Sequence, residues 1–320
     1  ELSRDENHQL RRQIGVVSGL MGKSLGLGRV NDAIARAATS AAPVLISGEL
    51  GVGKELVARS IHSDGKRANG PFVSLHCGAY SEDELAMELW GVEGALGDRP
   101  EQVGKYEAAS GGTLLLDEIG ELSLPLQEKV LRLLEGHPLR RLGGHEPLEV
   151  DVRLIASTSR DLNADVAAGR FRHDLFVRLK AEEIPVPALQ RRPEDLPELA
   201  QHFLEHFAQD IGKRVTGFTP AAMERMSRYR WPGNIRELRN VIERAVLLAR
   251  RPLVDTLDIL LPSSIASGGD PLTLEEAERR HLQAVLDHTG WNLDDAAKKL
   301  GIDKNILQRK IDGFDLTKSG

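Results

Sequence analysis

The sequence predicts an α/β protein with a mostly parallel sheet, followed by a helical segment and a small all-α module near the C-terminal end. Three observations lead to this fold class. Apolar runs typical of strands alternate with helical patterns up to residue 187. Only helical patterns follow between residues 193 and 249. After a stretch rich in Ser, Gly and Pro, short helical patterns resume from 274 to 311.

The composition is that of a globular protein with more than one domain. The chain has 320 residues, of which 41% are hydrophobic and 28% charged, and this length suggests two or three domains. The formal net charge of −6 excludes a global basic field, so any contact with DNA must come from a local patch. The single cysteine, Cys77, excludes an internal disulfide and fits a reducing cytoplasm. Its apolar surroundings favour a buried hydrophobic role over a nucleophilic one.

The sequence predicts a cytoplasmic protein that does not span a membrane. A segment that crosses a bilayer needs about 18 apolar residues, and no run in this sequence approaches that length. No signal peptide is recognisable either. The first 14 residues read as a charged helix without a methionine, which indicates a piece of a longer protein. This helix is interpreted either as a solvated linker or as a short coiled-coil stalk.

The predicted elements divide the chain into five parts. Strands are expected at 43–47, 72–75, 113–116, 152–157 and 183–186, and helices at 30–38, 56–61, 193–207, 220–229, 234–249, 274–288, 293–300 and 304–311. The resulting boundaries are a linker helix at 1–20, an α/β subdomain at 21–187, a helical subdomain at 188–262, a flexible linker at 263–272 and a C-terminal module at 273–320.

A glycine-rich loop follows the first predicted strand. Its sequence, GELGVGKE at 48–55, has the P-loop spacing, in which backbone N–H groups surround an anion and Lys54 reaches a terminal phosphate. A chance turn is the alternative, but the strand before it and the helix after it favour a nucleoside-triphosphate site. Glu55 stands where the general pattern has Ser or Thr. The residues expected to hold the nucleotide are Gly48, Glu49, Leu50, Gly51, Val52, Gly53, Lys54, Glu55 and Leu56.

Two carboxylates end the third predicted strand. An apolar run followed by Asp117 and Glu118 is typical of a Walker B motif, in which Asp117 holds Mg²⁺ and Glu118 orients the attacking water. An apolar run before Asp-Glu is common by itself. Together with the upstream P-loop, it predicts binding of ATP and Mg²⁺.

Several motifs in the same order resemble one family. The runs GGTLLLDEIGEL at 111–122, FRHDLFVRL at 171–179 and WPGNIRELRN at 231–240 are similar to the central AAA+ domain of bacterial enhancer-binding proteins, the NtrC-type activators of sigma-54 RNA polymerase. The Gly-Lys-Glu form of the P-loop also fits this family, which accounts for Glu55. The resemblance extends from about residue 20 to the C-terminal end.

The resemblance implies an AAA+ fold, a helical lid and a set of arginines at the nucleotide. Arg172 and Arg178 correspond to the paired arginines that reach the ATP of a neighbouring subunit, a role that suits the planar, permanently charged guanidinium. It therefore also implies a ring, a hexamer or heptamer. Arg236 corresponds to sensor II, an arginine of the lid. Without the motif, these arginines would read as solvated helix residues, and 231–233 as a simple turn before a helix.

The C-terminal module resembles the Fis-type helix-turn-helix of the same family. Its first helix and glycine turn read NLDDAAKKLGI at 292–302, and Asp303 is expected to cap a second helix in which Ile306, Leu307 and Ile311 face inward. Spacing alone leaves a protein-docking bundle open, whereas the resemblance implies a dimer on paired half-sites of double-stranded DNA. The residues expected to contact DNA are Lys304, Asn305, Gln308, Arg309 and Lys310.

Three positions depart from the family pattern. The sigma-54 contact loop of the family reads Gly-Ala-Phe-Thr-Gly-Ala, whereas this chain has the shorter ELWGVEGALGDRP at 88–100, without the Phe-Thr pair. His76 stands where an asparagine restrains the catalytic glutamate, and is expected to hydrogen-bond Glu118. Ser159 stands at the sensor I asparagine and is expected to bond a water or phosphate.

These observations predict a DNA-binding transcriptional regulator that binds and hydrolyses ATP at the subunit interfaces of a ring. Since the changes fall on the coupling positions, we expect it to act on RNA polymerase holoenzyme without standard sigma-54 remodelling. A conventional ATP-driven activator of sigma-54 RNA polymerase and an ATP-binding, non-hydrolysing repressor are the two alternatives.

Overall fold

The computed structural model describes residues 22, 24–94, 101–261, 282–283, 285–286, 289, 291–300 and 304–314. The chain forms two compact units, Glu1–Leu260 and Leu261–Gly320. The helix expected at 1–14, the linker expected at 263–272 and most of the helix expected at 274–288 lie outside the described residues.

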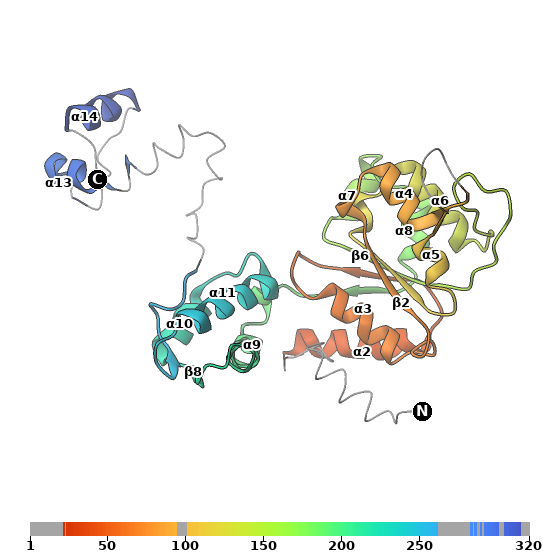
Figure 1. Cartoon of the computed structure of the whole chain (residues 1–320), viewed down its shortest axis with the longest axis horizontal. Coiled ribbons are helices and arrows are strands. Elements are labelled where there is room, and N and C mark those ends of the chain that lie inside the picture. Colours follow the sequence, from red (N-terminus) through yellow and green to blue (C-terminus); the bar gives the residue numbers. More distant parts are fainter. Residues whose placement is uncertain are drawn as a thin grey trace. The chain divides into compact units, whose positions relative to one another are not determined.

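The first unit is built on a five-stranded parallel sheet with the order β2-β5-β6-β1-β7 (Figure 1). All five predicted strands are confirmed. Because neighbouring strands run in the same direction, their carboxyl ends lie along one edge of the sheet, where the P-loop also begins. The strands are β1 (Val44–Ser47), β2 (Phe72–His76), β5 (Thr113–Asp117), β6 (Arg153–Thr158) and β7 (Glu183–Pro185).

Helices cover both faces of this sheet, as expected for an α/β fold (Figure 1). One face packs on α2 (Leu25–Thr39) and α3 (Lys54–Ser63), whose apolar side chains join those of β1 in one buried cluster. The other face carries a larger cluster. It packs against α4 (Glu82–Trp90), α5 (Lys105–Ala108), α6 (Leu124–Leu134) and α8 (His173–Leu179), with α7 (Leu162–Ala167) beside α8.

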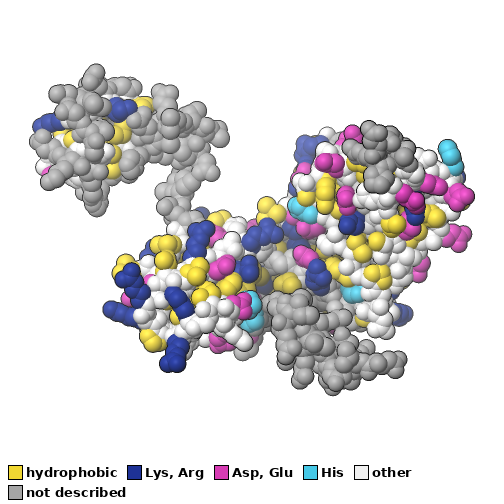
Figure 2. Space-filling model, viewed as in Figure 1, with side chains coloured by type: hydrophobic (Ala, Val, Ile, Leu, Met, Phe, Trp, Pro, Cys, Tyr) yellow, Lys and Arg dark blue, Asp and Glu magenta, His cyan; other side chains and the backbone are white. Residues whose placement is uncertain are grey.

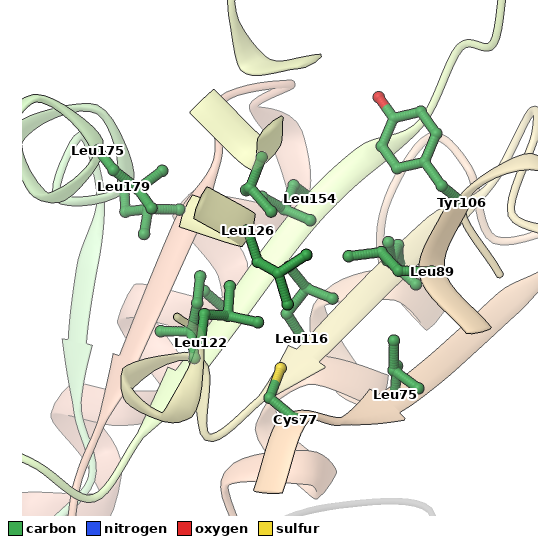
Figure 3. Packing of buried hydrophobic residues seen from close by; sticks show 14 of the residues in the cluster. Leu75, Cys77, Leu89, Tyr106, Leu116, Leu122, Leu126, Leu154, Leu175 and Leu179 are labelled. Atoms are coloured by element: carbon green, nitrogen blue, oxygen red, sulfur yellow. The ribbon is translucent and has the colours of Figure 1, made fainter. Parts of the chain in front are cut away.

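Cys77 belongs to this second cluster, among leucines such as Leu75, Leu116 and Leu122 (Figure 3). Its side chain is 2% exposed, and burial raises the pKa of the thiol to about 12. The thiolate is the reactive form of cysteine, so burial disfavours a nucleophilic role for this residue. The interpretation of Cys77 as a buried hydrophobic residue is confirmed.

The helical segment after residue 188 packs α9 (Leu196–Ile211) against α11 (Asn234–Leu248), with α10 (Pro220–Arg228) between them in sequence. Leu199, Phe203 and Phe207 are buried on α9, as its spacing predicts. The helical character expected for this segment is confirmed, with one addition that the sequence does not indicate. A two-residue parallel pair joins β8 (Gly217–Phe218) and β9 (Leu253–Val254), and strands this short leave no periodic pattern in a sequence.

Short elements connect these helices and strands. A two-stranded antiparallel pair, β3 (Gly91–Val92) and β4 (Gln102–Val103), follows α4. Among the residues that the structure describes, 3₁₀ turns cover Cys77–Ala79, Ile119–Glu121, Leu189–Arg191 and Pro193–Asp195. In Figure 2, basic and acidic side chains are interspersed over the part that carries the sheet, which fits the absence of a global basic field.

The second unit contains α13 (Leu293–Leu300) and α14 (Lys304–Gly313), which contact each other. Leu307 and Ile311 are buried with Leu282, Leu286, Ala296 and Ala297, so the inward position predicted for Leu307 and Ile311 is confirmed. Asp303 and the side chain of Ile306 lie outside the described residues. No helix in the described part of the chain is long and apolar enough to cross a bilayer.

Candidate nucleotide site

The P-loop joins the end of β1 to the start of α3 at the carboxyl edge of the sheet. Gly51 and Gly53 have φ values of +78° and +101°, which residues with a side chain rarely adopt. In addition, a Cβ at Gly51 would lie 2.3 Å from the carbonyl oxygen of Gly233. The loop ends where α3 begins at Lys54, so the N–H groups of the first turn of α3 face the loop. This arrangement forms an anion-binding cradle at a helix N-terminus.

Lys54 is buried at the centre of this cradle, with 6% of the residue exposed. Its ammonium donates hydrogen bonds to the carbonyl oxygens of Gly48, at 2.9 Å, and Glu49, at 3.3 Å. It also forms an ion pair with Glu118, where Nζ lies 2.9 Å from Oε1. Lys54 therefore connects the P-loop directly to the carboxylate that ends β5.

Glu118 is held by two further bonds. Its Oε2 accepts hydrogen bonds from the backbone N–H and the hydroxyl of Ser159, both at 2.7 Å. Burial by itself raises the pKa of Glu118, but Lys54 and Ser159 outweigh it, so the pKa lies below its usual value and the carboxylate is charged. Its backbone is left-handed, with φ of +56°, which is uncommon for a non-glycine residue and often marks a functional position.

Asp117 and His76 lie beside this pair, at the ends of neighbouring strands. Oδ1 of Asp117 accepts a hydrogen bond from the hydroxyl of Ser157, and Oδ2 lies 3.1 Å from Nδ1 of His76. The expectation that His76 hydrogen-bonds Glu118 is wrong. The register of β2 and β5 places His76 opposite Asp117, while Glu118 is already bonded to Lys54 and Ser159.

The other P-loop residues differ in their exposure. Val52 is fully buried, whereas Leu50 is an exposed apolar residue at the mouth of the loop. Glu55, on the exposed side of α3, accepts two hydrogen bonds from the guanidinium of Arg59, at 2.6 and 3.1 Å. Leu56 is half-buried in the first turn of α3.

The lid segment contacts the P-loop through the start of α11. The carbonyl oxygen of Gly51 accepts a hydrogen bond from the N–H of Ile235 at 2.9 Å, and Arg236 lies next to it, with Cβ 3.1 Å from the position of a Cβ built on Gly51. Arg236, which is expected to be the sensor II arginine, therefore lies beside the P-loop. Arg236 is exposed, so its side chain is open to a ligand.

Asn234 connects three segments and was not singled out from the sequence. Its side-chain amide donates to Oε2 of Glu49 and to the carbonyl oxygen of Leu50, both at 3.0 Å. Its Oδ1 accepts from the N–H of Leu189 at 2.7 Å. The residue is fully buried, with φ of +51°. A non-glycine residue in a turn after Pro-Gly and before a helix is the only signal that the sequence offers.

A second buried polar group lies behind the P-loop. Arg192 is 1% exposed, and its Nη2 donates to the carbonyl oxygen of Val52 at 3.2 Å. Asp195, also buried, accepts from the N–H of Ser24 at 2.8 Å through Oδ1. These bonds join the start of α2, the P-loop and the start of the lid. They were also not anticipated, because each spans more than 100 residues of sequence.

Arg172 and Arg178 lie together at α8 but bond different groups. Arg172 pairs with Asp174, with Nη2 2.8 Å from Oδ2, and more weakly with Glu128 at 3.5 Å. Arg178 is exposed and donates two hydrogen bonds to the carbonyl oxygen of Leu134, at 2.9 and 3.1 Å. Within the described residues, neither guanidinium bonds the Lys54–Glu118 pair of its own chain.

The region of the expected sigma-54 contact loop is described only at its base. β3 and β4 pair Gly91 with Val103 and Val92 with Gln102, and residues 95–100, including Leu96, lie outside the described residues. A second segment joins this base: Leu142 donates to the carbonyl oxygen of Gly91 and accepts from the N–H of Glu93, both at 3.0 Å. The base of the loop is thus formed by three segments.

The candidate DNA-binding residues occupy one helix. All five lie on α14, whose buried side faces the apolar cluster of the second unit. Lys304 and Gln308 are exposed and Lys310 is half-exposed, whereas the side chains of Asn305 and Arg309 lie outside the described residues.

The donor set fits a magnesium ion bound together with a nucleotide. Asp117 is a half-exposed carboxylate at the strand edge, next to the anion cradle, and Mg²⁺ is commonly held by one or two carboxylates plus phosphate oxygens. Across the described segments, no group of three or more His, Cys, Asp and Glu side chains could hold a metal ion alone. A metal here would need oxygen ligands from the nucleotide.

Comparison with known families matches three consecutive parts of the chain. Residues 20–185 match the sigma-54 interaction domain, residues 190–273 the AAA+ ATPase lid domain, and residues 273–314 the bacterial regulatory protein Fis family.

Curated relatives match over most of the chain. The transcriptional regulatory protein ZraR of Escherichia coli K12 is 45% identical over 302 residues, which cover 92% of this chain and 68% of ZraR. The response regulator protein PilR of Pseudomonas aeruginosa is 40% identical over 308 residues, covering 91% of this chain and 68% of PilR.

Solved structures of NtrX from Brucella abortus are also similar. The complex with ATP is 35% identical, with a TM-score of 0.76, and the match covers 97% of this chain and 73% of that one. The complex with ADP is 35% identical, with a TM-score of 0.77, covering 98% and 72%. The similarity therefore spans the sheet, the lid and the helix-turn-helix.

Proposed function

The chain belongs to the NtrC-type family of bacterial enhancer-binding proteins, and from that premise we propose that it is a DNA-bound, ATP-hydrolysing regulator of transcription. The observation that carries the proposal is the Lys54–Glu118 ion pair inside a P-loop cradle. This pair places a phosphate-binding cation and a carboxylate for the attacking water within one hydrogen-bond length of each other. The NtrX complexes with ATP and ADP support the choice of nucleotide.

The residues of the cradle divide the chemistry between them. The P-loop N–H groups and Lys54 bind the phosphates, and Glu118 orients a water for attack once Lys54 turns to the nucleotide. Asp117 would hold Mg²⁺, which neutralises charge on the phosphate oxygens when it is bound. Ser159 keeps the carboxylate of Glu118 in place through two hydrogen bonds.

We assign Arg172 and Arg178 to the pocket of a neighbouring protomer in a hexameric or heptameric ring. Arg178 is exposed, and its two bonds to a backbone carbonyl are replaceable by bonds to phosphate oxygens. Arg236, at the P-loop, completes the set from the lid of the same chain. Binding of ATP thereby stabilises the ring.

The variant loop at 88–100 is the reason that we expect no standard remodelling of sigma-54 polymerase. The base of the loop is formed by β3, β4 and the segment at Leu142, but its sequence lacks the Phe-Thr pair of the family. A loop with Leu96 in place of an aromatic tip presents less apolar surface to a partner. Regulation therefore depends on DNA binding through α14 as a dimer on paired half-sites, without standard sigma-54 remodelling.

In vitro transcription with each form of RNA polymerase holoenzyme tests this function. We expect ATP-dependent effects on transcription from promoters that carry the protein's binding sites, and no opening of sigma-54 promoters. ATP-dependent formation of open complexes with the sigma-54 holoenzyme would instead establish a conventional activator. The pairing of β3 with β4 at the base of the loop favours this alternative. Absence of ATP turnover, with ATP bound, would establish a repressor that acts by occupancy.

Replacement of Arg309 tests the DNA-binding module. In Arg309→Ala we expect weaker specific binding, by about 10-fold to 100-fold if the side chain reads a base edge. Footprinting on a selected site measures this, and Lys318→Ala, beyond α14, is the control. An unchanged footprint for Arg309→Ala would place recognition outside α14.

A further inference from the structure

The pair formed by His76 and Asp117 departs from an all-oxygen magnesium site. His76 ends β2 and Asp117 ends β5, and the parallel register of these strands sets the two residues side by side. Nδ1 of His76 lies 3.1 Å from Oδ2 of Asp117. Both side chains face solvent at the edge that carries the P-loop, with 51% of His76 and 26% of Asp117 exposed.

This separation is the one that two ligands of a single metal ion adopt. In an octahedral site with metal–ligand distances of about 2.0–2.1 Å, two adjacent ligands lie about 3 Å apart. A divalent ion can therefore replace the hydrogen bond between Nδ1 and Oδ2, provided that the exposed imidazole turns so that the lone pair of Nδ1 points at the ion instead of at Oδ2. Imidazole then coordinates through the lone pair on Nδ1, and the proton is carried by Nε2.

The neighbouring carboxylates have other partners. Oε1 of Glu121 lies 3.5 Å from Nη1 of Arg160, and Glu118 is bonded to Lys54 and Ser159. Asp117 is therefore the carboxylate that is available to a metal beside His76.

We propose that His76 is a ligand of the metal ion that accompanies the nucleotide, and that the site therefore favours Mn²⁺ or a similar transition metal over Mg²⁺. Imidazole nitrogen is a ligand of divalent transition metals, whose affinity for such a donor is lowest at Mn²⁺ and rises towards Cu²⁺, whereas magnesium prefers oxygen. Since the described residues hold no third protein ligand nearby, phosphate oxygens and water complete the sphere. Binding of the metal thus depends on the nucleotide, and this inference rests on the proposed ATP site.

Pulsed electron paramagnetic resonance of Mn²⁺ with ADP tests the proposal on the 320-residue chain. Wild-type protein should show electron spin echo modulation from a directly bound ¹⁴N nucleus, and His76→Asn should lose it. His137→Asn, an exposed histidine that lies 3.8 Å from Glu135, is the matched control and should keep the signal. Competition with Mg²⁺ should show that His76→Asn lowers the preference for Mn²⁺ by about 10-fold or more.

Two results would overturn the inference. One is a wild-type Mn²⁺–ADP complex without a nitrogen signal, and the other is an equal preference for Mn²⁺ in wild type and His76→Asn. Both leave the ATP site intact, because ADP still binds. Failure of wild-type protein to bind ADP in any metal would overturn the proposed function together with this inference. ADP binding by His76→Asn, measured by calorimetry, shows that the variant is folded.

Discussion

At the scale of single residues, the centre of the site is one buried ion pair, formed by Lys54 and Glu118. Lys54 is the cation bonded to Glu118, and the hydroxyl and N–H of Ser159 supply the other bonds to that carboxylate. The pair is almost fully buried, so removal of one member leaves the other without compensation in a low-dielectric setting. Single substitutions should therefore separate binding from turnover.

Lys54→Ala should lose nucleotide binding, by at least about 100-fold. The substitution removes a charge-assisted bond to the phosphates and leaves the negative charge of Glu118 facing them. Titration with a fluorescent ATP analogue measures the affinity. Lys66→Ala, an exposed lysine beyond α3, is the control and should bind as wild type does. Affinity that persists in Lys54→Ala would reject the P-loop assignment.

Glu118→Gln should bind ATP and fail to turn it over. The amide keeps the size of the side chain but is a poor acceptor for a proton from water, so hydrolysis should fall by about 100-fold or more. Steady-state release of phosphate measures this. Glu121→Gln, three residues further along and exposed, should retain activity. Equal turnover in Glu118→Gln and wild type would exclude Glu118 as the carboxylate that orients water.

At the scale of elements, two sets of bonds hold the pieces of the site together. One joins α11 to the P-loop through Asn234, and the other joins the end of β6 to α7 through Asp165. Asp165 is buried and receives hydrogen bonds from Arg160 and Arg170. Both sets should contribute to stability in ways that can be measured without a ligand.

Asn234→Ala should lower the free energy of unfolding by about 2–4 kcal/mol. It removes three hydrogen bonds, leaves the buried N–H of Leu189 without its acceptor, and places alanine at a positive φ. Asn234→Gly loses the same bonds without the backbone strain and should therefore be less destabilising. Urea denaturation compares them. Stability equal to wild type in both variants would show that Asn234 does not hold the lid segment to the P-loop.

Asp165→Asn should destabilise the fold at neutral pH, by roughly 1.5–3 kcal/mol. Hydrogen bonds from Arg160, and then from Arg170, lower the pKa of Asp165 below its usual value of 3.8. Because the folded pKa is the lower one, the contribution is present above pH 3.8 and is lost as the pH falls through the folded pKa.

Thermal denaturation at several pH values checks this dependence. The difference between wild type and Asp165→Asn should shrink as the pH falls below 3.8. Asp151→Asn removes a comparable pair with Arg67, but its carboxylate is 80% exposed, so its effect should stay below about 1 kcal/mol. A gap between wild type and Asp165→Asn that does not change with pH would contradict the charged pair.

The sequence indicates the elements better than the bonds between them. Apolar runs reveal β1, β2, β5, β6 and β7, because a buried parallel strand needs apolar residues along its length. β8 and β9 are not predicted, because a strand of two residues is too short to show an alternating pattern. The sequence also does not predict the partner of His76. Whether His76 bonds Asp117 or Glu118 depends on the register of the strands and on the bonds that Glu118 already makes. Asn234 meets Glu49 across 185 residues, a contact without a local signal.

At the scale of the whole molecule, the proposed assembly completes each site with groups from two chains. The P-loop, Glu118 and Arg236 belong to one protomer, and Arg172 and Arg178 are assigned to the next. A single chain should therefore be nearly inactive, and ATPase activity should rise with protein concentration. The family supports this expectation, and mixing experiments test it.

A mixture of two inactive variants should recover activity. Arg178→Ala retains the P-loop but lacks the arginine for its neighbour, whereas Lys54→Ala retains the arginine but lacks the phosphate-binding lysine. Mixed rings contain interfaces with both intact parts, so phosphate release should exceed that of either variant alone. The double variant mixed with Lys54→Ala, which lacks any intact interface, is the control. No recovery in the first mixture would place Arg178 outside the neighbouring pocket.

The bond between Lys54 and Glu118 links the two roles proposed for these residues. A triphosphate that binds the ammonium group of Lys54 competes with the carboxylate of Glu118 for the same cation. Under the proposed function, binding of the nucleotide and release of the carboxylate that orients water are therefore one step.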